Sequence, residues 1–517
     1  MGGYLGLPRQ RNAMNEGAAL PQAAGVWSHA SAPWYRTLFL TDMWERFGFY
    51  GMQAILVLYA AAPESRGGLG LPSADAAALF GAWIGLAFMF SMPGGWVGDR
   101  LLGPRRALLV GGVIIALGHF SLAVPAAGFT AVGLLLLALG TGLYKPNHQT
   151  MINMMFGKDS GRRESGISLM YVGIQVSALL APLITGYLGE RVNWHVGFAI
   201  AGLAMLIGVV QLATAARQFG SVGGQPGRPL NAVARRTVAR RTSAVLATLL
   251  ALVVAGLLTG TLTPTSGIIV VGLLGLIVPV IAFLLVHRHP ELQAGDRQRL
   301  RAFLWVFLGS ALFWMMIAQD GSVLTLFARD STDLNAAGFT LPVSWLLSAT
   351  PLFILFLAPC FAWALARMRT HATVPTKFAL GLLLAGTSFL LMSVAAALAA
   401  DDAKVSPIWL LTVYFMHACG ELIIAAVGIS AAADVLPPAF MGQTLGLLWL
   451  FAALGGGLGS QIVRLSQSLP QTVYFLGCGL VTTFAGLVFA WRRRAITRAL
   501  AAGLTTTVVI TPVAATT

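Results

Sequence analysis

Long apolar stretches recur along the whole chain and are separated by short clusters of charged, glycine and proline residues. A helix that crosses the hydrocarbon core of a bilayer needs about 20 predominantly apolar residues. By this measure the pattern predicts fourteen membrane-spanning helices, over residues 36–60, 76–98, 104–124, 129–150, 165–187, 193–213, 242–262, 266–287, 302–328, 342–366, 374–398, 406–434, 440–463 and 469–491. We therefore expect an all-α polytopic membrane protein.

The composition agrees with this pattern. Hydrophobic residues make up 57% of the 517 residues and charged residues 10%, whereas a soluble protein carries about 25% charged residues; the mean hydropathy is +0.78. These values exclude a soluble enzyme, a disordered chain and a fibrous repeat. Cys360, Cys419 and Cys478 all lie in apolar runs, so we expect no disulfide framework and no zinc site. The first 34 residues do not show the pattern of a signal peptide.

The positive charges lie mostly on one side of the predicted membrane. An even number of spans puts both termini on the same side. On that side lie 26 of the 33 Lys and Arg residues, and the opposite side holds five: Arg66, Arg191, Arg329, Lys404 and Arg464. The positive-inside rule therefore predicts that both termini are cytoplasmic. The topology accounts for the net charge of +15, and we expect no nucleic-acid partner.

The spans divide into six, two and six. A linker rich in glycine, proline and arginine, residues 217–241, follows the sixth span, and the next two spans carry no acidic or basic residue before His287. We expect five regions: a cytoplasmic tail (1–35), a six-helix bundle (36–216), a basic linker with a two-helix insert (217–301), a second six-helix bundle (302–492) and a cytoplasmic tail (493–517). Because the insert is uniformly apolar, we expect it to face lipid and to have no chemical role.

Six charged residues lie deep inside predicted spans, away from the span ends. A charge at the bilayer centre costs at least about 2.5 to 3.5 kcal/mol, so each one should face a partner or a water-filled cavity. These residues are Asp42, Glu45, Arg46, Lys145, Asp320 and Glu421. We expect function to reside among them.

Asp42, Glu45 and Arg46 share one face of the first helix, since they are three and four residues apart. Two carboxylates beside one guanidinium are close to neutral only if one carboxylate takes up a proton. The cluster is therefore a candidate proton site. A structural ion triad that pins two helices together is the alternative.

Lys145 and Glu421 are isolated charges on separate helices. Lys145 precedes Pro146 and Asn147, and its ammonium needs a carboxylate or an anionic ligand. Structural pairing with the first-helix acids and contact with a substrate carboxylate are both open. Glu421 has no basic neighbour within two turns except His417, so it meets a cation across the cavity, stays protonated, binds a substrate amine or has a structural role.

The other buried ionisable residues give weaker signals. Asp320 stands in a polar, kink-prone stretch, where pairing with Arg329 is as well supported as a functional role. His417 and Glu421 are four residues apart, like a metal-binding pair. No third ligand is well placed, so we expect no metal site.

The glycine-rich segment GGWVGDRLLGPRR, residues 94–106, lies between the second and third spans. Its glycines allow helices to approach closely. Its charged residues could form a cytoplasmic gate that breaks when two halves of a carrier rock; they are Asp99, Arg100, Arg105 and Arg106.

This loop resembles the signature loop of the major facilitator superfamily. DMWERFGFYG resembles the ExxERFxYYG motif of the proton-dependent oligopeptide transporter family. Further blocks resemble those of the same family in the same order: LYKPNHQTMINMMF, FWMMIAQDGSVLTLFA, LPVSWLLSATPLFILFLAP and GELIIAAVGISAAADVLPPAFMGQTLGLLWL. The resemblance covers about residues 35–492, and bacterial members of the family carry a similar two-helix insert.

The resemblance implies a major facilitator fold and a function. The protein would be a multi-pass protein of the bacterial inner membrane and not an enzyme. It would act as a monomeric symporter that imports di- and tripeptides by alternating access, with protons as coupling ion and no cofactor. Its proton-coupling residues would be Asp42, Glu45, Arg46 and Lys145. Its substrate pocket would contain Arg46, Tyr50, Lys145, Gln175, Trp314, Glu421 and Trp449.

Within that pocket, the resemblance implies that Arg46 and Lys145 lie near the peptide carboxylate and that Glu421 receives the amino terminus. The chain also departs from the family pattern. Gln53 and Ala318 stand where the family often has an Arg and a Glu that form an outer salt bridge, so we expect that bridge to be absent.

These departures leave a second transport function open, for a restricted set of peptides or another small carboxylate-bearing solute. An intramembrane enzyme would need a nucleophile–base pair or a metal cluster, and the sequence shows neither. A channel or receptor fits separated buried charges less well than a two-state carrier does.

Overall fold

The computed structural model describes residues 32–157, 160–336, 338–367, 373–400, 403–433, 435–436 and 440–501. The first group of helices comprises α2 (Pro33–Ala61), α3 (Ser73–Met89), α4 (Ser91–Val97), α5 (Pro104–Leu122), α6 (Ala127–Phe156), α7 (Ser160–Arg191) and α8 (Trp194–Thr214). The middle pair comprises α9 (Ala232–Leu258) and α10 (Pro264–His287). The last group comprises α11 (Ala294–Ile317), α12 (Val323–Ser331), α13 (Ala349–Arg367), α14 (Val374–Leu398), α15 (Ile408–Ala433), α16 (Met441–Ile462) and α17 (Gln471–Ala501).

Short elements join the long helices. They are the helical turns η1 (Glu64–Arg66), η3 (Ala216–Phe219), η4 (Val343–Ser348) and η6 (Val463–Gln467), the π-helical turn η2 (Gly98–Leu102), and a hairpin of β1 (Asn335–Ala336) with β2 (Phe339–Thr340). Residues 1–31 and 502–517, which include most of the two predicted tails, lie outside the described residues.

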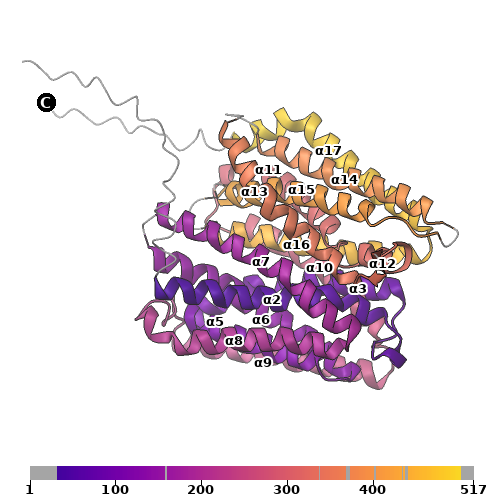
Figure 1. The fold of residues 1–517 in the computed structure, drawn as a ribbon. Coiled ribbons are helices and arrows are strands. Elements are labelled where there is room, and N and C mark those ends of the chain that lie inside the picture. Colours follow the sequence, from indigo (N-terminus) through magenta and orange to yellow (C-terminus); the bar gives the residue numbers. More distant parts are fainter. Residues whose placement is uncertain are drawn as a thin grey trace, which may run out of the picture.

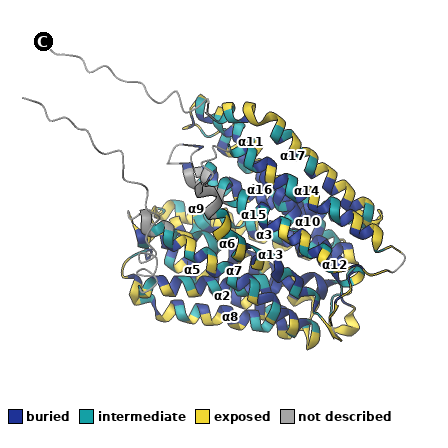
Figure 2. Ribbon diagram, turned by 45° about the horizontal axis from the view of Figure 1, so that its top comes forward, coloured by how far each residue is buried: buried dark blue, intermediate teal, exposed yellow. Residues whose placement is uncertain are grey.

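The long helices gather into two groups, one early and one late in the chain (Figure 1). In the first group α2 packs against α7 and α8, and α5 packs against α6 and α8. In the second, α14 packs against α15 and α17, and α11 packs against α16. Buried residues line the contacts between helices, and exposed residues follow the outer faces of α8 and α17 (Figure 2). Many of these exposed residues are apolar, such as Leu203 and Phe484, which suits contact with lipid.

Thirteen helices of the described chain are long and apolar enough to cross a membrane, which confirms the prediction of an all-α polytopic protein. The predicted first span, α2, is not among them. Its middle carries Asp42, Glu45 and Arg46, which lower its hydropathy. Most of α2 is nevertheless buried between its neighbours, so the helix belongs to the bundle and its charges face inwards.

The two groups meet where α3 lies against α16. A side chain at Gly81 of α3 would come within 3.0 Å of the carbonyl oxygen of Gly456 of α16. Glycine is therefore required for the backbones to approach this closely. The halves also meet where α7 packs against η4 and α13.

The insert differs from the sequence expectation. Helix α9 has no buried residue, which agrees with a lipid-facing helix. Helix α10, by contrast, packs against both α3 and α16, and a side chain at Gly275 would lie 3.0 Å from Cα of Gly457. The expectation that the whole insert only faces lipid is wrong, because the glycines of α10 let it pack beside the contact between the two halves.

Candidate functional site

Asp42, Glu45 and Arg46 lie together on one face of α2, as their spacing predicts. Nε of Arg46 is 3.2 Å from Oε2 of Glu45 and 3.7 Å from Oδ1 of Asp42. Asp42 and Glu45 are 4% and 1% exposed. Neither oxygen of Glu45 has a hydrogen-bond donor within the described part of the chain. Two buried carboxylates thus share one guanidinium, and a proton or a second cation is needed to neutralise them.

His148 of α6 joins this cluster and was missed from the sequence. Its Nδ1 is 3.7 Å from Oδ1 of Asp42, and its Nε2 is 3.1 Å from the carbonyl oxygen of Leu38. Because a carbonyl only accepts, Nε2 carries a hydrogen, and Nδ1 faces the carboxylate either as a lone pair or, in the imidazolium, as an N–H. The signal was available, since His148 follows Lys145 by three residues and shares its helix face.

Lys145 of α6 is surrounded by aromatic rings. Its Nζ is 4.0 Å from the ring centroid of Phe49 and 5.6 Å from that of Phe88. Phe88 in turn stacks on Trp449 of α16, with centroids 5.6 Å apart. No ion pair within 4.0 Å joins Lys145 to a described carboxylate. In this state cation–π contacts hold the ammonium, and it is free to meet an anion.

Glu421 of α15 is partly exposed and faces the first group of helices. Its carboxylate lies near the hydroxyls of Tyr50 on α2 and Tyr171 on α7. Among the described residues no Lys or Arg pairs with it. Within the described residues Glu421 therefore stands without an ionic partner, on the half opposite Lys145 and Arg46.

The remaining predicted pocket residues are distributed around this interface. Gln175 is buried on α7, one turn from Tyr171. Trp314 is partly exposed on α11, with its ring edge-on to Phe313 at 5.7 Å. Trp449 is 37% exposed. The predicted pocket residues thus come from both halves of the chain.

Asp320 lies where a helix is broken, between the end of α11 and the start of α12, as the polar sequence there suggests. It does not pair with Arg329, which instead binds the neighbouring Asp330 at 2.6 Å. Its Oδ1 is 2.8 Å from Nδ1 of His417 on α15. The suggested pairing with Arg329 is therefore wrong, because α12 continues for two turns and carries Arg329 away from the break.

The glycine-rich segment 94–106 forms α4, η2 and the start of α5. A side chain at Gly98 would collide with Asn147 of α6, whose Nδ2 donates to the carbonyl oxygen of Gly94 at 3.0 Å. This confirms that the glycines serve close approach. Arg105 donates to the carbonyl oxygen of Gly220 at 2.8 Å, and Arg100 donates to that of Arg228 at 3.5 Å.

The contacts of the predicted cytoplasmic gate residues thus run to the linker, and no ion pair among the described residues joins them to one another. The backbone of Asp99 accepts from the N–H of Arg228, and none of the described ion pairs includes the side chains of Asp99 or Arg106. In this state the loop is hydrogen-bonded to the linker 217–241. Ion pairs among the four gate residues stay a prediction.

At the opposite end of the bundle, where α2 ends and α3 begins, a charged network joins three parts of the chain. Asp75 of α3 is 4% exposed. Its Oδ1 is 2.9 Å from Nη2 of Arg464 in η6, and its Oδ2 accepts from the hydroxyl of Thr265 of α10 at 2.7 Å. The first half, the second half and the insert therefore meet at one carboxylate. Sequence reasoning missed this network.

A second contact closes the same end. The carboxylate of Glu190, at the end of α7, accepts from the backbone N–H groups of Val343 and Ser344 at 2.9 Å each and from the Ser344 hydroxyl at 2.5 Å. A carboxylate at the start of a helical turn satisfies its free N–H groups. Both contacts hold the α2–α3 end closed.

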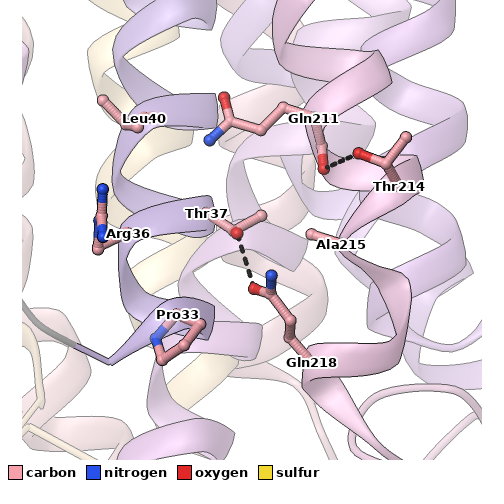
Figure 3. Close-up of a pocket in the computed structure, with 8 residues that line it drawn as sticks. All are labelled: Pro33, Arg36, Thr37, Leu40, Gln211, Thr214, Ala215 and Gln218. Atoms are coloured by element: carbon pink, nitrogen blue, oxygen red, sulfur yellow. Dashed lines mark hydrogen bonds between the residues drawn. The ribbon is translucent and has the colours of Figure 1, made fainter.

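A groove of about 330 Å³ lies elsewhere, between the start of α2 and the end of α8. It is lined by eight residues that include Arg36, Gln211 and Gln218, and the Thr37 hydroxyl donates to Oε1 of Gln218 at 2.9 Å (Figure 3). It contains none of the predicted site residues. The predicted coupling and pocket residues lie instead on α2, α6 and α7 of the first half and on α11, α15 and α16 of the second.

The chain folds into two helical halves that carry buried charges and are closed against each other at one end. This arrangement is typical of a membrane carrier. Comparison with known proteins makes this specific. Residues 105–477 match the model of the POT family. A di-/tripeptide transporter of Lactococcus lactis subsp. cremoris is 33% identical over 467 residues, which cover 87% of this chain and 93% of that protein.

Solved structures agree. A peptide transporter POT crystallised with sulfate superposes with a TM-score of 0.85 at 38% identity, over 90% of this chain and 95% of that one. A POT family transporter crystallised with 5-aminolevulinic acid gives 0.85 at 30% identity, over 90% and 96%. The chain belongs to the POT family, as its motifs predicted. It is a multi-pass integral protein of the bacterial inner membrane and a transporter, not an enzyme.

Proposed function

We propose that this protein is a proton-coupled symporter that imports di- and tripeptides by alternating access. The observation that carries the proposal is the arrangement of unpaired charge. Lys145 of the first half has no ionic partner among the described residues, and neither does Glu421 of the second. A short peptide is a zwitterion, so its carboxylate suits Lys145 and Arg46, and its ammonium suits Glu421.

The aromatic surroundings suit a ligand whose side chains vary. The ring faces of Phe49 and Phe88 contact the Lys145 ammonium, and Trp449 stacks on the other side of Phe88. Tyr50, Gln175 and Trp314 supply further polar and apolar surface. Charged groups that bind the two termini fix the length of the peptide, and the broad apolar walls between them accept varied side chains. Such a site would bind many different peptides of similar length.

Proton coupling rests in this proposal on α2. Asp42 and Glu45 are buried, Arg46 is partly exposed, and the three carry a net charge of −1 when fully ionised. The positive charge of Lys145 lies close enough to offset this charge, although no ion pair joins it to the described carboxylates. A peptide carboxylate that engages Lys145 removes that compensation, and a proton on Glu45 or Asp42 restores neutrality. Substrate and proton therefore favour each other.

The proposed topology is fourteen spans, six plus two plus six, with both termini in the cytoplasm. The thirteen apolar helices together with the buried α2 support this number. The excess of Lys and Arg on the side of the termini supports the orientation. The network at Asp75 then lies at the outer end, and the segment with Asp99, Arg100, Arg105 and Arg106 forms the cytoplasmic gate. Since one chain supplies both halves of the site, the carrier works as a monomer.

A second candidate is transport of a small amino-carboxylate solute or of a restricted peptide set. The related transporter crystallised with 5-aminolevulinic acid supports it, because that molecule also carries an amine and a carboxylate. The replaced gate positions Gln53 and Ala318 support it too.

Uptake by purified protein in liposomes tests the proposal. Labelled dialanine should accumulate when the outside is made acidic, and unlabelled di- and tripeptides should compete while tetra-alanine should not. Competition by 5-aminolevulinic acid stronger than by any peptide would favour the second candidate. No accumulation with either labelled solute would refute both.

A further inference from the structure

The second half contains a buried acid–base pair that takes no part in the proton coupling proposed for α2. Asp320, at the break between α11 and α12, lies 2.8 Å from Nδ1 of His417. The other ring nitrogen of His417, Nε2, lies 2.9 Å from the hydroxyl of Ser388 on α14. His417 is fully buried, and the ring of Phe389 stacks on it with centroids 6.1 Å apart. Three helical segments thus meet at one imidazole.

The hydrogen bonds around His417 are arranged to hold an extra proton. The Ser388 hydroxyl donates to the carbonyl oxygen of Ala385 at 2.7 Å, so its oxygen presents a lone pair to Nε2. Asp320 presents a carboxylate oxygen to Nδ1. An imidazole with acceptors at both nitrogens is satisfied as the imidazolium. If the proton leaves, the Ser388 hydroxyl can rotate and donate to Nε2, so the neutral ring is satisfied as well.

The described residues around Asp320 include no other cation that could neutralise it. Tyr414 and Glu421 face the pair from α15, and Gln319, beside Asp320, accepts from the hydroxyl of Tyr474 on α17 at 2.7 Å. Tyr474 lies next to Cys478. Within the described residues, none of the ion pairs of Lys or Arg reaches this group. His417 is the group whose protonation decides whether the pair is neutral or carries −1.

The pair also has an edge towards solvent. The side chain of Asp320 is 12% exposed, whereas that of His417 is 0% exposed. A proton can therefore reach the imidazole through the carboxylate. Glu421 lies one turn from His417 on the same face of α15, so the proton changes the field at the site proposed for the substrate amine.

We propose that Asp320 and His417 form a second proton-binding site of the transport cycle, separate from the cluster on α2. When the outer side is open, a proton from that side binds and converts the neutral imidazole beside the Asp320 carboxylate to the imidazolium. The same proton leaves to the cytoplasm when the inner side opens. This inference rests on the proposed proton-coupled function and adds one proton per peptide to it.

The proton-to-peptide stoichiometry tests the inference. Asp320→Asn combined with His417→Gln removes both titratable groups and keeps hydrogen-bonding side chains. In liposomes with a pH difference of one unit and no membrane potential, two protons per peptide limit dialanine accumulation to about 100-fold and one proton to about tenfold. The wild type should approach the first limit and the double variant the second. Asp330→Asn, which alters an exposed acid paired with Arg329, is the matched control and should behave as the wild type.

The outcomes separate the two proposals. A wild type that shows no gradient-driven accumulation would refute the proposed function itself. A wild type and a double variant with the same stoichiometry would overturn the second proton site and leave the pair as a structural contact.

Ser388→Ala provides a test that does not require the double variant to fold. It removes the acceptor at Nε2 and should move the pH of half-maximal transport towards acid by about one unit, since it weakens one hydrogen bond to a charged group. Ser388→Thr should restore the wild-type profile. An unchanged profile in Ser388→Ala would count against the inference.

Discussion

The network at the α2–α3 end predicts that a residue of the insert controls how often the outer side opens. Thr265 of α10 donates to the Asp75 carboxylate at 2.7 Å, and the carboxylate also pairs with Arg464 of the second half at 2.9 Å. All three groups come together only when α3, α10 and η6 are in contact. Thr265→Val keeps the size and shape of the side chain and removes the hydroxyl.

The size of the effect follows from the type of bond lost. A hydrogen bond to a charged group contributes about 1.5 to 3 kcal/mol. In the proposed transport cycle this bond breaks when the outer side opens, so its loss should raise the fraction of outer-open molecules by about 10- to 100-fold. Removing a partner of the ion pair, as in Arg464→Gln, should have a larger effect, since it leaves the buried Asp75 uncompensated.

Thiol labelling measures this opening. Ser460 of α16 is fully buried against α3, where its hydroxyl donates to the carbonyl oxygen of Ala78 at 2.8 Å. A cysteine placed there, in a background without the three native cysteines, should react with an impermeant maleimide from outside only when the outer side opens. Thr265→Val should accelerate labelling by the factor above, and Thr265→Ser, which keeps the hydroxyl, should not.

Two results would refute this reasoning. Equal labelling rates for Thr265→Val and the wild type would mean that the insert takes no part in closing the outer side. A double variant, Asp75→Asn with Arg464→Gln, that labels faster than either single variant would mean that the two groups do not depend on each other.

The remaining predictions concern the substrate site. Lys145→Ala should abolish gradient-driven uptake, and peptides with an amidated carboxyl terminus should compete poorly with the wild type; equal inhibition by free acid and amide would contradict a cation at that position. Glu421→Gln should weaken dipeptide binding by about tenfold to a hundredfold but leave the weak binding of an N-acetylated dipeptide unchanged; an equal loss for both ligands would assign Glu421 a structural role. Gln53→Arg should impair transport, and Gln53→Arg with Ala318→Glu should recover part of the loss; equal impairment would show that the two positions do not face each other.

The elements that could be predicted from the sequence are those fixed by local spacing. Asp42, Glu45 and Arg46 share a helix face because three- and four-residue spacings bring side chains together on any α-helix. The polar residues around Asp320 marked a kink-prone stretch, and the structure ends α11 there, although the predicted span 302–328 ran through the break into α12. The apolar stretches themselves predict most spans within a few residues.

The contacts that could not be predicted join distant parts of the chain. Hydrophobic periodicity identifies a helix but does not say which neighbour it meets. The pairs Asp320–His417 and Asp75–Arg464 depend on how whole helices pack, so local sequence patterns could not predict them. The role of α10 was missed for a similar reason, since its uniform apolarity suggested lipid, whereas Gly275 permits a close contact with α16.

The state of Lys145 also lay beyond local reasoning. Its charge required a partner, and carboxylates were the obvious candidates. The fold instead places the ammonium over Phe49, at a position where the family motif has Tyr. The packing of α6 on α2 determines whether Lys145 meets a carboxylate or an aromatic ring.

The central claim is that protons drive peptide accumulation through the cluster on α2, and Glu45→Gln tests it most directly. In liposomes with an acidic exterior, the wild type should concentrate labelled dialanine. The variant should not, while still exchanging labelled for unlabelled peptide across the membrane, because the fold can rock without a titratable group at position 45. Accumulation by Glu45→Gln to the wild-type ratio under the same gradient would contradict the account.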